Sequence, residues 1–180
     1  MHDCQTPWEA IVVSRTRESP TIVSLGVQFT DIEQARAFHF QPGQFNMLYL
    51  YGIGEVPISI VSDPMRRDEF IHTIRAVGRV TREMAQLQIG DYLGVRGPFG
   101  HGWPLEAARG KDILLTTGGL GCAPSVSVIN YIMQRREQYG QLTIIQGVKH
   151  MDDLIWRDRY EQWMQMPNTQ VLLEADVCLL

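Results

Sequence analysis

The chain has 180 residues, of which 44% are hydrophobic and 20% charged, which suits one substantial core or two small ones and excludes disorder. Its formal net charge of -4, with scattered Lys and Arg residues, excludes the basic surface that a nucleic-acid partner needs. No apolar stretch reaches the roughly 18 residues of a membrane span, and the N-terminus lacks the features of a signal peptide, so a cytoplasmic location is expected.

The first half of the chain is typical of an antiparallel β-barrel or sandwich, because short β-rich runs are separated by turn residues. The expected strands are 9–16, 21–29, 44–51, 57–62, 69–78 and 91–97. One short helix, at about 81–87, is expected to interrupt the series.

From Asp112 the pattern changes to alternating strands and helices. A strand at 112–117, a glycine-rich turn and a helix at 125–140 form the first unit, which Gly140 closes. A second unit follows, with a strand at 141–147, a helix at 152–165 and a third strand at 169–176. This alternation predicts a parallel sheet with right-handed crossovers, the opening of a doubly wound nucleotide-binding lobe.

The expected fold class is therefore β plus α/β, with an antiparallel barrel in residues 1–108 and part of an α/β lobe in residues 109–180. The boundary falls within the segment 97–110. A free-standing domain usually has about 100 residues or more. The second lobe is shorter, so it is expected to be truncated or completed by a partner.

The turn Thr117–Pro124, with the pattern GGxGxxP, lies between an expected strand and an expected helix. Backbone N–H groups and the helix dipole can face a pyrophosphate there, and glycines allow a ligand to approach the main chain. Pro124 suits the first helical turn because its missing N–H has no intrahelical partner to lose. A nucleotide-binding role is favoured over the alternative, a merely tight connection.

Two segments of the first half are further candidates. Ser59, in the run Pro57–Ile60, offers a hydroxyl and an amide, although the run by itself is that of an ordinary strand. The segment Arg75–Thr81 ends a strand and begins a helix, so its amides and the Thr81 hydroxyl could hold a phosphate. Thr81 as a simple helix N-cap explains the same pattern equally well.

Neither a metal site nor an acid–base dyad is expected. The cysteines are far apart and lack CxxC spacing, which favours reduced, buried or incidental thiols at Cys4, Cys122 and Cys178. The histidines lie in separate segments, which assigns surface or structural roles to His39, His72, His101 and His150.

Five motifs occur in the order seen in the ferredoxin-NADP reductase superfamily, and the resemblance covers nearly the whole chain: PGQF (42–45), PISI (57–60), RAVGRVT (75–81), GPFGHGWP (97–104) and GGLGCAP (118–124). The segments GEVPISIVSDP and IRAVGRVT are most similar to the gamma subunits of cytoplasmic nickel-iron hydrogenases and sulfhydrogenases. The electron-transfer subunit of dihydroorotate dehydrogenase is also similar.

This resemblance implies that FAD binds outside the barrel. Pro57, Ile58 and Ser59 would line the isoalloxazine, with Ser59 near flavin N5 as the residue closest to the reaction. The pyrophosphate would be held in the segment that contains Arg75, Val77, Gly78, Val80 and Thr81, with Arg75 as a supporting cation.

The resemblance also implies a site for NAD or NADP in the second lobe. The nicotinamide nucleotide would lie on the loop that contains Gly118, Gly119, Gly121, Ala123 and Pro124. Gly147 and Lys149 match a G-x-R segment near the adenosine ribose or phosphate, and Asp153 begins the helix that follows.

Three features depart from the family pattern. Val56 replaces an arginine that binds flavin phosphate in many relatives, and Ile58 replaces a stacking tyrosine. The C-terminal cysteine-glycine-proline segment is absent, since Leu179 follows Cys178. The cysteine-rich tail that carries a [2Fe-2S] cluster in some relatives is also missing, so a cluster is expected only if a missing tail or a partner supplies it.

The resulting functional hypothesis is an electron-transfer flavoprotein subunit that passes electrons between NAD(P)H and a metal-centre partner through FAD. The expected partner is the catalytic subunit of a hydrogenase or sulfur-reductase complex. One alternative is a non-catalytic module that binds FAD or a partner, because the second lobe is incomplete. Another is a reductase subunit of dihydroorotate dehydrogenase, sulfite reductase or an oxygenase.

Overall fold

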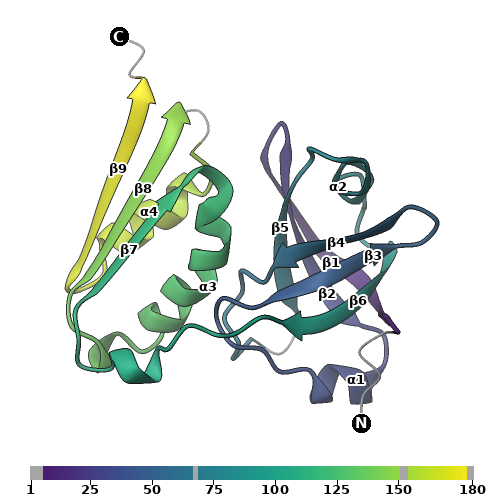
Figure 1. Ribbon diagram of the computed structural model, residues 1–180, viewed down its shortest axis with the longest axis horizontal. Helices are drawn as coiled ribbons and strands as arrows, with labels where there is room; N and C mark the ends of the chain where they lie inside the picture. The colour runs from purple at the N-terminus through teal and green to yellow at the C-terminus, as the bar shows by residue number, and fades with distance from the viewer. Residues whose placement is uncertain (1–5, 67–68, 151–153, 178–180) are drawn as a thin grey trace.

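The computed structural model describes residues 6–66, 69–150 and 154–177, and it consists of a β-barrel followed by an α/β lobe (Figure 1). The barrel strands form a six-stranded antiparallel sheet in the order β4-β3-β6-β1-β2-β5. The strands are β1 (Trp8–Ser19), β2 (Ile22–Phe29), β3 (Phe45–Leu50), β4 (Gly54–Ser59), β5 (Phe70–Arg75) and β6 (Tyr92–Phe99). The expected antiparallel barrel is confirmed, with β4 beginning and ending three residues before the expected strand at 57–62.

The sheet closes on itself where the end of β4 meets β5. Ile60 forms a β-bridge with His72, and the Val61 amide donates to the Ile71 carbonyl at 2.9 Å. Closure encloses a core that includes Leu25, Leu48 and Leu93, all of them fully buried. The ends of β4 and β5 are thereby held side by side, which matters because both belong to the candidate site.

Two short helices accompany the barrel. Helix α2 (Arg79–Met84) follows β5, close to the expected position. Helix α1 (Ile32–Ala37) was not expected. Asp31 supplies its N-cap, since the side-chain Oδ1 accepts from the amides of Glu33 at 2.8 Å and Gln34 at 3.0 Å. A cap of this kind stabilises a helix too short to show an apolar periodicity.

The second lobe is a parallel sheet of three strands in the order β7-β8-β9, as expected for the start of a doubly wound lobe. Its elements are β7 (Ile113–Gly118), α3 (Cys122–Met133), β8 (Leu142–His150), α4 (Arg157–Met164) and β9 (Thr169–Val177). Both helices contribute to one core with β8, through Val126, Ile129, Tyr160, Trp163, Leu142 and Ile144. Helix α3 lies between this sheet and the barrel (Figure 1).

The bounds of both lobe helices differ from the prediction. Helix α3 begins three residues earlier than expected and ends at Met133, and only a 3-10 turn, η3 (Arg136–Gln138), follows before Gly140. Arg136 causes the early end, because its buried guanidinium donates to the carbonyls of Pro167, Asn168, Tyr139 and Gly140. Those contacts require the chain to leave the helical path.

Helix α4 begins only at Arg157, five residues after the predicted start. Trp156 has a positive φ of 61°, which ends any right-handed helix at that point. The side chains of Leu154, Ile155 and Trp156 are nevertheless buried in the lobe core. The predicted helical conformation of these three residues was therefore wrong, although their side chains are buried.

The two parts are joined by residues 100–112, which include the 3-10 turn η1 (Glu106–Ala108). Apolar side chains of the barrel cross into the core of the second lobe, since Ile22 and Val61 pack there and Ile71 lies against it. Within the described ranges, none of the helices combines the length and apolar character that crossing a bilayer requires.

Candidate nucleotide-binding site

The glycine-rich loop lies at the carboxyl end of β7, as the sequence predicted. Gly118 is the last residue of β7, Gly119–Gly121 form a 3-10 turn called η2, and α3 follows directly. Gly119 has a φ of 52°, a left-handed conformation that favours glycine. A Cβ atom built on Gly118, Gly119 or Gly121 would meet no atom within 4 Å, so open space faces this backbone. A ligand can therefore approach the main chain there without moving a side chain.

The neighbouring strand continues the same surface. Gly147 of β8 lies in register with Gly118 of β7, and a Cβ built on it would meet only the Thr117 carbonyl oxygen, at 3.8 Å. Lys149, two residues further along β8, is exposed. Ligands of open α/β sheets bind at the carboxyl ends of the strands. These glycines therefore provide a suitable surface for a bound nucleotide. Asp153, the other residue assigned to this region, lies outside the described residues.

The buried side chain of Gln146 holds the glycine-rich loop in place. Its side chain is 1% exposed, and its Nε2 donates to the carbonyl oxygens of Gly119 and Gly147, each at 3.0 Å. Its Oε1 accepts a hydrogen bond from the Thr117 hydroxyl. A buried amide with its polar atoms satisfied holds both strand ends in one conformation. Gln146 was not among the predicted site residues, although a glutamine inside the apolar run LTIIQ is a visible signal.

The remaining loop residues have different surroundings. Pro124 lies in the first turn of α3, as predicted. Ala123 is 5% exposed and packs in the lobe core, so its side chain supports the loop from inside. Burial raises the pKa of the adjacent Cys122 thiol to about 11, while a hydrogen bond with Tyr160 opposes the shift. Cys122 is therefore a neutral, buried thiol near neutral pH.

In the barrel, successive residues of β4 face opposite sides of the sheet. Val56 and Ile58 pack against the barrel core, whereas Pro57 is exposed and Ser59 lies on the same outer side as Pro57. Of the three predicted flavin contacts, Pro57 and Ser59 thus present their side chains to the outside of the barrel. Ile58, the third predicted flavin contact, has its side chain against the core, so its predicted role falls to its backbone.

His72 holds the end of β4 in place. It is fully buried, and its Nδ1 donates to the Ser59 carbonyl oxygen at 2.9 Å, so Nε2 is left to accept from the Asn46 amide at 3.2 Å. Burial lowers the His72 pKa to about 4, against the opposing effect of the backbone contacts with Ser59 and Ile58. The imidazole ring is therefore neutral near pH 7. The structural role of His72 is to position the backbone of Ser59.

The loop before α2 contains the expected phosphate-binding segment. Gly78 is the N-cap residue, and the Thr81 hydroxyl accepts from the amides of Val77 at 3.1 Å and Gly78 at 2.9 Å. Thr81 is the third residue of α2, so the alternative of Thr81 as the N-cap residue was wrong, although its hydroxyl does bond the backbone amide of the N-cap residue Gly78. The Val80 side chain packs towards β4, 3.3 Å from a Cβ built on Gly54. The groups left for a phosphate are the amides at the start of α2, where helices have no internal acceptors.

Arg75 and Arg79 are exposed at the two ends of this loop, and Val77 is 63% exposed between them. The loop thus combines two cations with helix amides, a combination that suits an anionic group. Within the described ranges, no three His, Cys, Asp or Glu side chains gather closely enough to hold a metal ion.

The two candidate regions meet around Ile22. In the β2–β5 ladder Ile22 is the Cα partner of Arg75, and the same residue lines a small cavity together with Gly119 and Leu120. Arg75, where the barrel loop begins, and the glycine-rich loop therefore both adjoin the buried residue Ile22. Sequence reasoning did not find Ile22, because nothing in a strand residue shows which domain it will contact.

Comparison with known proteins agrees with this geometry. Residues 115–175 match the family model described as the oxidoreductase NAD-binding domain. The match begins in β7 and ends in β9, so it covers the glycine-rich loop and the register pair of Gly118 and Gly147.

Among curated proteins, the gamma subunit of sulfhydrogenase 1 from Pyrococcus furiosus is 45% identical over 134 residues, which are 74% of this chain and 46% of that protein. A probable electron-transfer subunit of NAD(+)-dependent dihydroorotate dehydrogenase B from Methanocella arvoryzae is 30% identical over 155 residues, 86% of this chain and 53% of that protein. The chain thus spans about half the length of the curated relatives it matches.

Solved structures show the same fold. Ferredoxin-NADP+ reductase from Plasmodium falciparum superimposes with a TM-score of 0.80 at 18% identity, over 97% of this chain and 72% of that chain. The Neisseria gonorrhoeae reductase, solved with bound FAD and NADP, gives a TM-score of 0.78 at 20% identity, over 93% and 67% of the two chains. The chain therefore has the fold of these reductases over most of its length.

In sequence the chain resembles the sulfhydrogenase gamma subunits and the dihydroorotate dehydrogenase electron-transfer subunits, and in fold it resembles the ferredoxin-NADP reductases. The resemblance drawn from its motifs is confirmed.

Proposed function

We propose that this chain is the cofactor-binding part of a cytoplasmic electron-transfer reductase subunit, with FAD on the barrel, residues 1–108, and NAD or NADP on the lobe, residues 109–180. One observation carries the proposal. Ile22 pairs with Arg75 in the β2–β5 ladder and lines a small cavity with Gly119, so the barrel loop that begins at Arg75 and the open glycine-rich loop both adjoin one residue. That arrangement suits transfer between two bound cofactors.

The chain's own residues would bind and orient. The outward side chains of Pro57 and Ser59 would lie against the isoalloxazine, and the first amides of α2 with Arg75 would hold the pyrophosphate. The open backbone of Gly118–Gly121 and the adjacent Gly147 would receive the nicotinamide nucleotide, with Lys149 near its adenosine part. When bound, FAD supplies the exchange between hydride transfer and single-electron transfer.

The proposed acceptor is a metal centre in a catalytic partner subunit of the hydrogenase or sulfur-reductase type. The identity to a sulfhydrogenase gamma subunit supports this choice, and the weaker identity to dihydroorotate dehydrogenase subunits makes those the second candidates. A [2Fe-2S] cluster is part of the proposal only where a further segment or a partner supplies its ligands.

The first test is the visible absorption spectrum of the purified protein with and without added FAD, followed by anaerobic addition of NADH or NADPH. A flavin spectrum that either nucleotide bleaches is the expected result. Flavin that binds without being bleached would leave only a flavin-binding module, and no flavin uptake would overturn the FAD assignment.

Gly118→Val tests the nucleotide site specifically. Gly118 has extended backbone angles, with φ -133° and ψ 133°, and its Cβ position is open, so valine fits the folded protein while occupying ligand space. We expect at least a tenfold weaker nucleotide affinity with an unchanged melting temperature and an unchanged flavin spectrum. Thr116→Val, on the same exposed face of β7, is the matched control. Equal nucleotide affinity in both variants would move the nucleotide away from this loop.

A further inference from the structure

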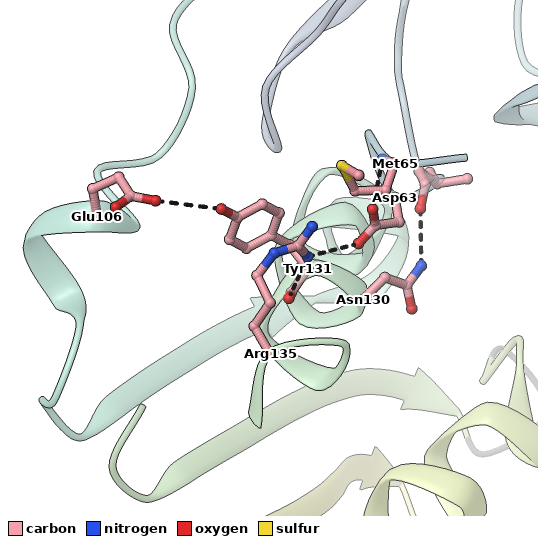
Figure 2. Close-up of polar contacts among 7 residues, drawn as sticks. Asp63, Met65, Glu106, Asn130, Tyr131 and Arg135 are labelled. Atoms are coloured by element: carbon pink, nitrogen blue, oxygen red, sulfur yellow. Dashed lines mark hydrogen bonds and ion pairs between the residues drawn. The ribbon is translucent and has the colours of Figure 1, made fainter. Parts of the chain in front are cut away.

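Helix α3 connects the glycine-rich loop with the flavin-binding part of the barrel. Its first turn follows Gly121, and its other end lies on the connection between β4 and β5 (Figure 2). There the Asn130 Nδ2 donates to the Val61 carbonyl at 3.2 Å, and the Arg135 Nη1 pairs with the Asp63 carboxylate at 3.4 Å. These four residues form what is called here the interlobe clamp.

Arg135 is well ordered by its own neighbours. Its guanidinium lies over the Tyr131 ring at 3.8 Å, and its Nη1 also donates to the Tyr131 carbonyl at 3.0 Å (Figure 2). The Arg135 and Asp63 side chains are 18% and 13% exposed. An ion pair this shielded is only weakly screened by salt, unlike an exposed surface pair. The stacked Tyr131 ring also restricts the rotamers of Arg135. The ion pair can therefore fix both the distance between Arg135 and Asp63 and the direction in which Arg135 points.

The barrel side of the clamp is likewise held by hydrogen bonds. Asp63 accepts from the Met65 amide at 2.7 Å, and the Ile60 and Val61 amides donate to Gln44 at 3.1 Å and Ile71 at 2.9 Å. Val61 follows Ser59 by two residues, so no free segment separates the clamp from the flavin-facing end of β4. On the other side, the helix from Cys122 to Asn130 spans about 12 Å at 1.5 Å per residue.

We propose that Asn130 and Arg135 are positioning residues for transfer between the two cofactors. Helix α3 on one side and the hydrogen-bonded end of β4 on the other transmit these contacts, so the two residues set the position of the glycine-rich loop relative to Ser59. This inference rests on the proposed function, because it assigns a role in the same reaction.

The contacts that hold the two lobes together differ from those that align them. Ile22 and Val61 are buried in the lobe core and supply apolar contact between the two parts. Apolar contact is non-directional, so the lobes stay attached without the ion pair but lose an alignment constraint. The expected signature is a slower transfer step with nearly unchanged binding of each cofactor, since a misplacement of about 1 Å can cost roughly a hundredfold in rate.

The experiment compares the wild-type protein with Arg135→Met, Asp63→Asn and the double variant, all loaded with FAD. Anaerobic stopped-flow absorption gives the flavin reduction rate at saturating nucleotide, and its concentration dependence gives the nucleotide Kd. We expect at least a tenfold slower rate in each single variant, no further loss in the double variant, and a Kd within twofold of wild type. Arg36→Met, which breaks the exposed Arg36–Glu33 pair, is the control and should leave both values unchanged.

Each outcome is decisive. A folded Arg135→Met variant with the wild-type rate, or a rate loss matched by an equal loss of affinity, overturns the positioning role. If Arg135→Met does not fold, Asn130→Ala removes one hydrogen bond of the clamp and must slow the reduction at unchanged Kd. Wild-type flavin that no nicotinamide nucleotide reduces overturns the proposed function itself, and the positioning role with it.

Discussion

The buried histidine beside Ser59 makes the folding stability of this protein depend on pH in a defined window. His72 has a folded pKa of about 4, against 6.5 for a free histidine, because burial disfavours its charged form. Above pH 6.5 the ring is neutral in both the folded and the unfolded states. As the pH falls from 6.5 towards 4, the unfolded state takes up the proton first, and the folded state loses stability.

The magnitude follows from the shift. The difference between 6.5 and about 4 corresponds, at 1.36 kcal/mol per pKa unit, to about 3 kcal/mol in full, of which about 2 kcal/mol is already lost at pH 5. His72→Gln removes the titration but keeps an amide that can donate to the Ser59 carbonyl and accept from Asn46. The variant should therefore lack this part of the pH dependence.

Urea unfolding at pH 8 and at pH 5 measures the effect. The free energy of unfolding should fall by about 2 kcal/mol more in the wild type than in His72→Gln over this interval. His101→Gln, at an exposed position, should follow the wild type. Equal losses in the wild type and His72→Gln would refute the reasoning, because His72 would then titrate alike in the folded and unfolded states.

Two further predictions concern the second lobe. Arg136→Met should lower the free energy of unfolding, measured by urea denaturation, by about 3 kcal/mol. The buried guanidinium donates to several carbonyls, including those of Pro167 and Tyr139, and methionine has no donor to replace it. A loss below about 1 kcal/mol would contradict this prediction. In the native protein at pH 8, Cys122 should react with iodoacetamide far more slowly than a free thiol, because its pKa is raised to about 11 and its side chain is buried. In urea it should react at the rate of a free thiol. Rapid native labelling of Cys122 would show that the start of α3 opens.

The order of elements and the candidate loops were readable in the sequence because they depend on local properties. β-rich runs between turn residues predicted the barrel strands, and the change of rhythm at Asp112 predicted the parallel lobe. The GGLG turn was placed correctly between strand and helix, since glycine and Pro124 have conformational preferences that hold in any fold. The motif order was sufficient to predict the resemblance to ferredoxin-NADP reductases.

Tertiary structure decided what depends on residues far apart in the chain. Helix α3 ends at Met133 because Arg136 reaches the carbonyl of Pro167, and α4 starts late because Trp156 adopts a left-handed conformation while buried in the core. Gln146 and His72 support the two candidate sites through side-chain contacts with Gly119 and Ser59, which only the folded chain brings within reach. The pairing of Arg135 with Asp63 likewise joins residues 72 positions apart. Local sequence sets backbone preferences, whereas such contacts exist only once both lobes have packed.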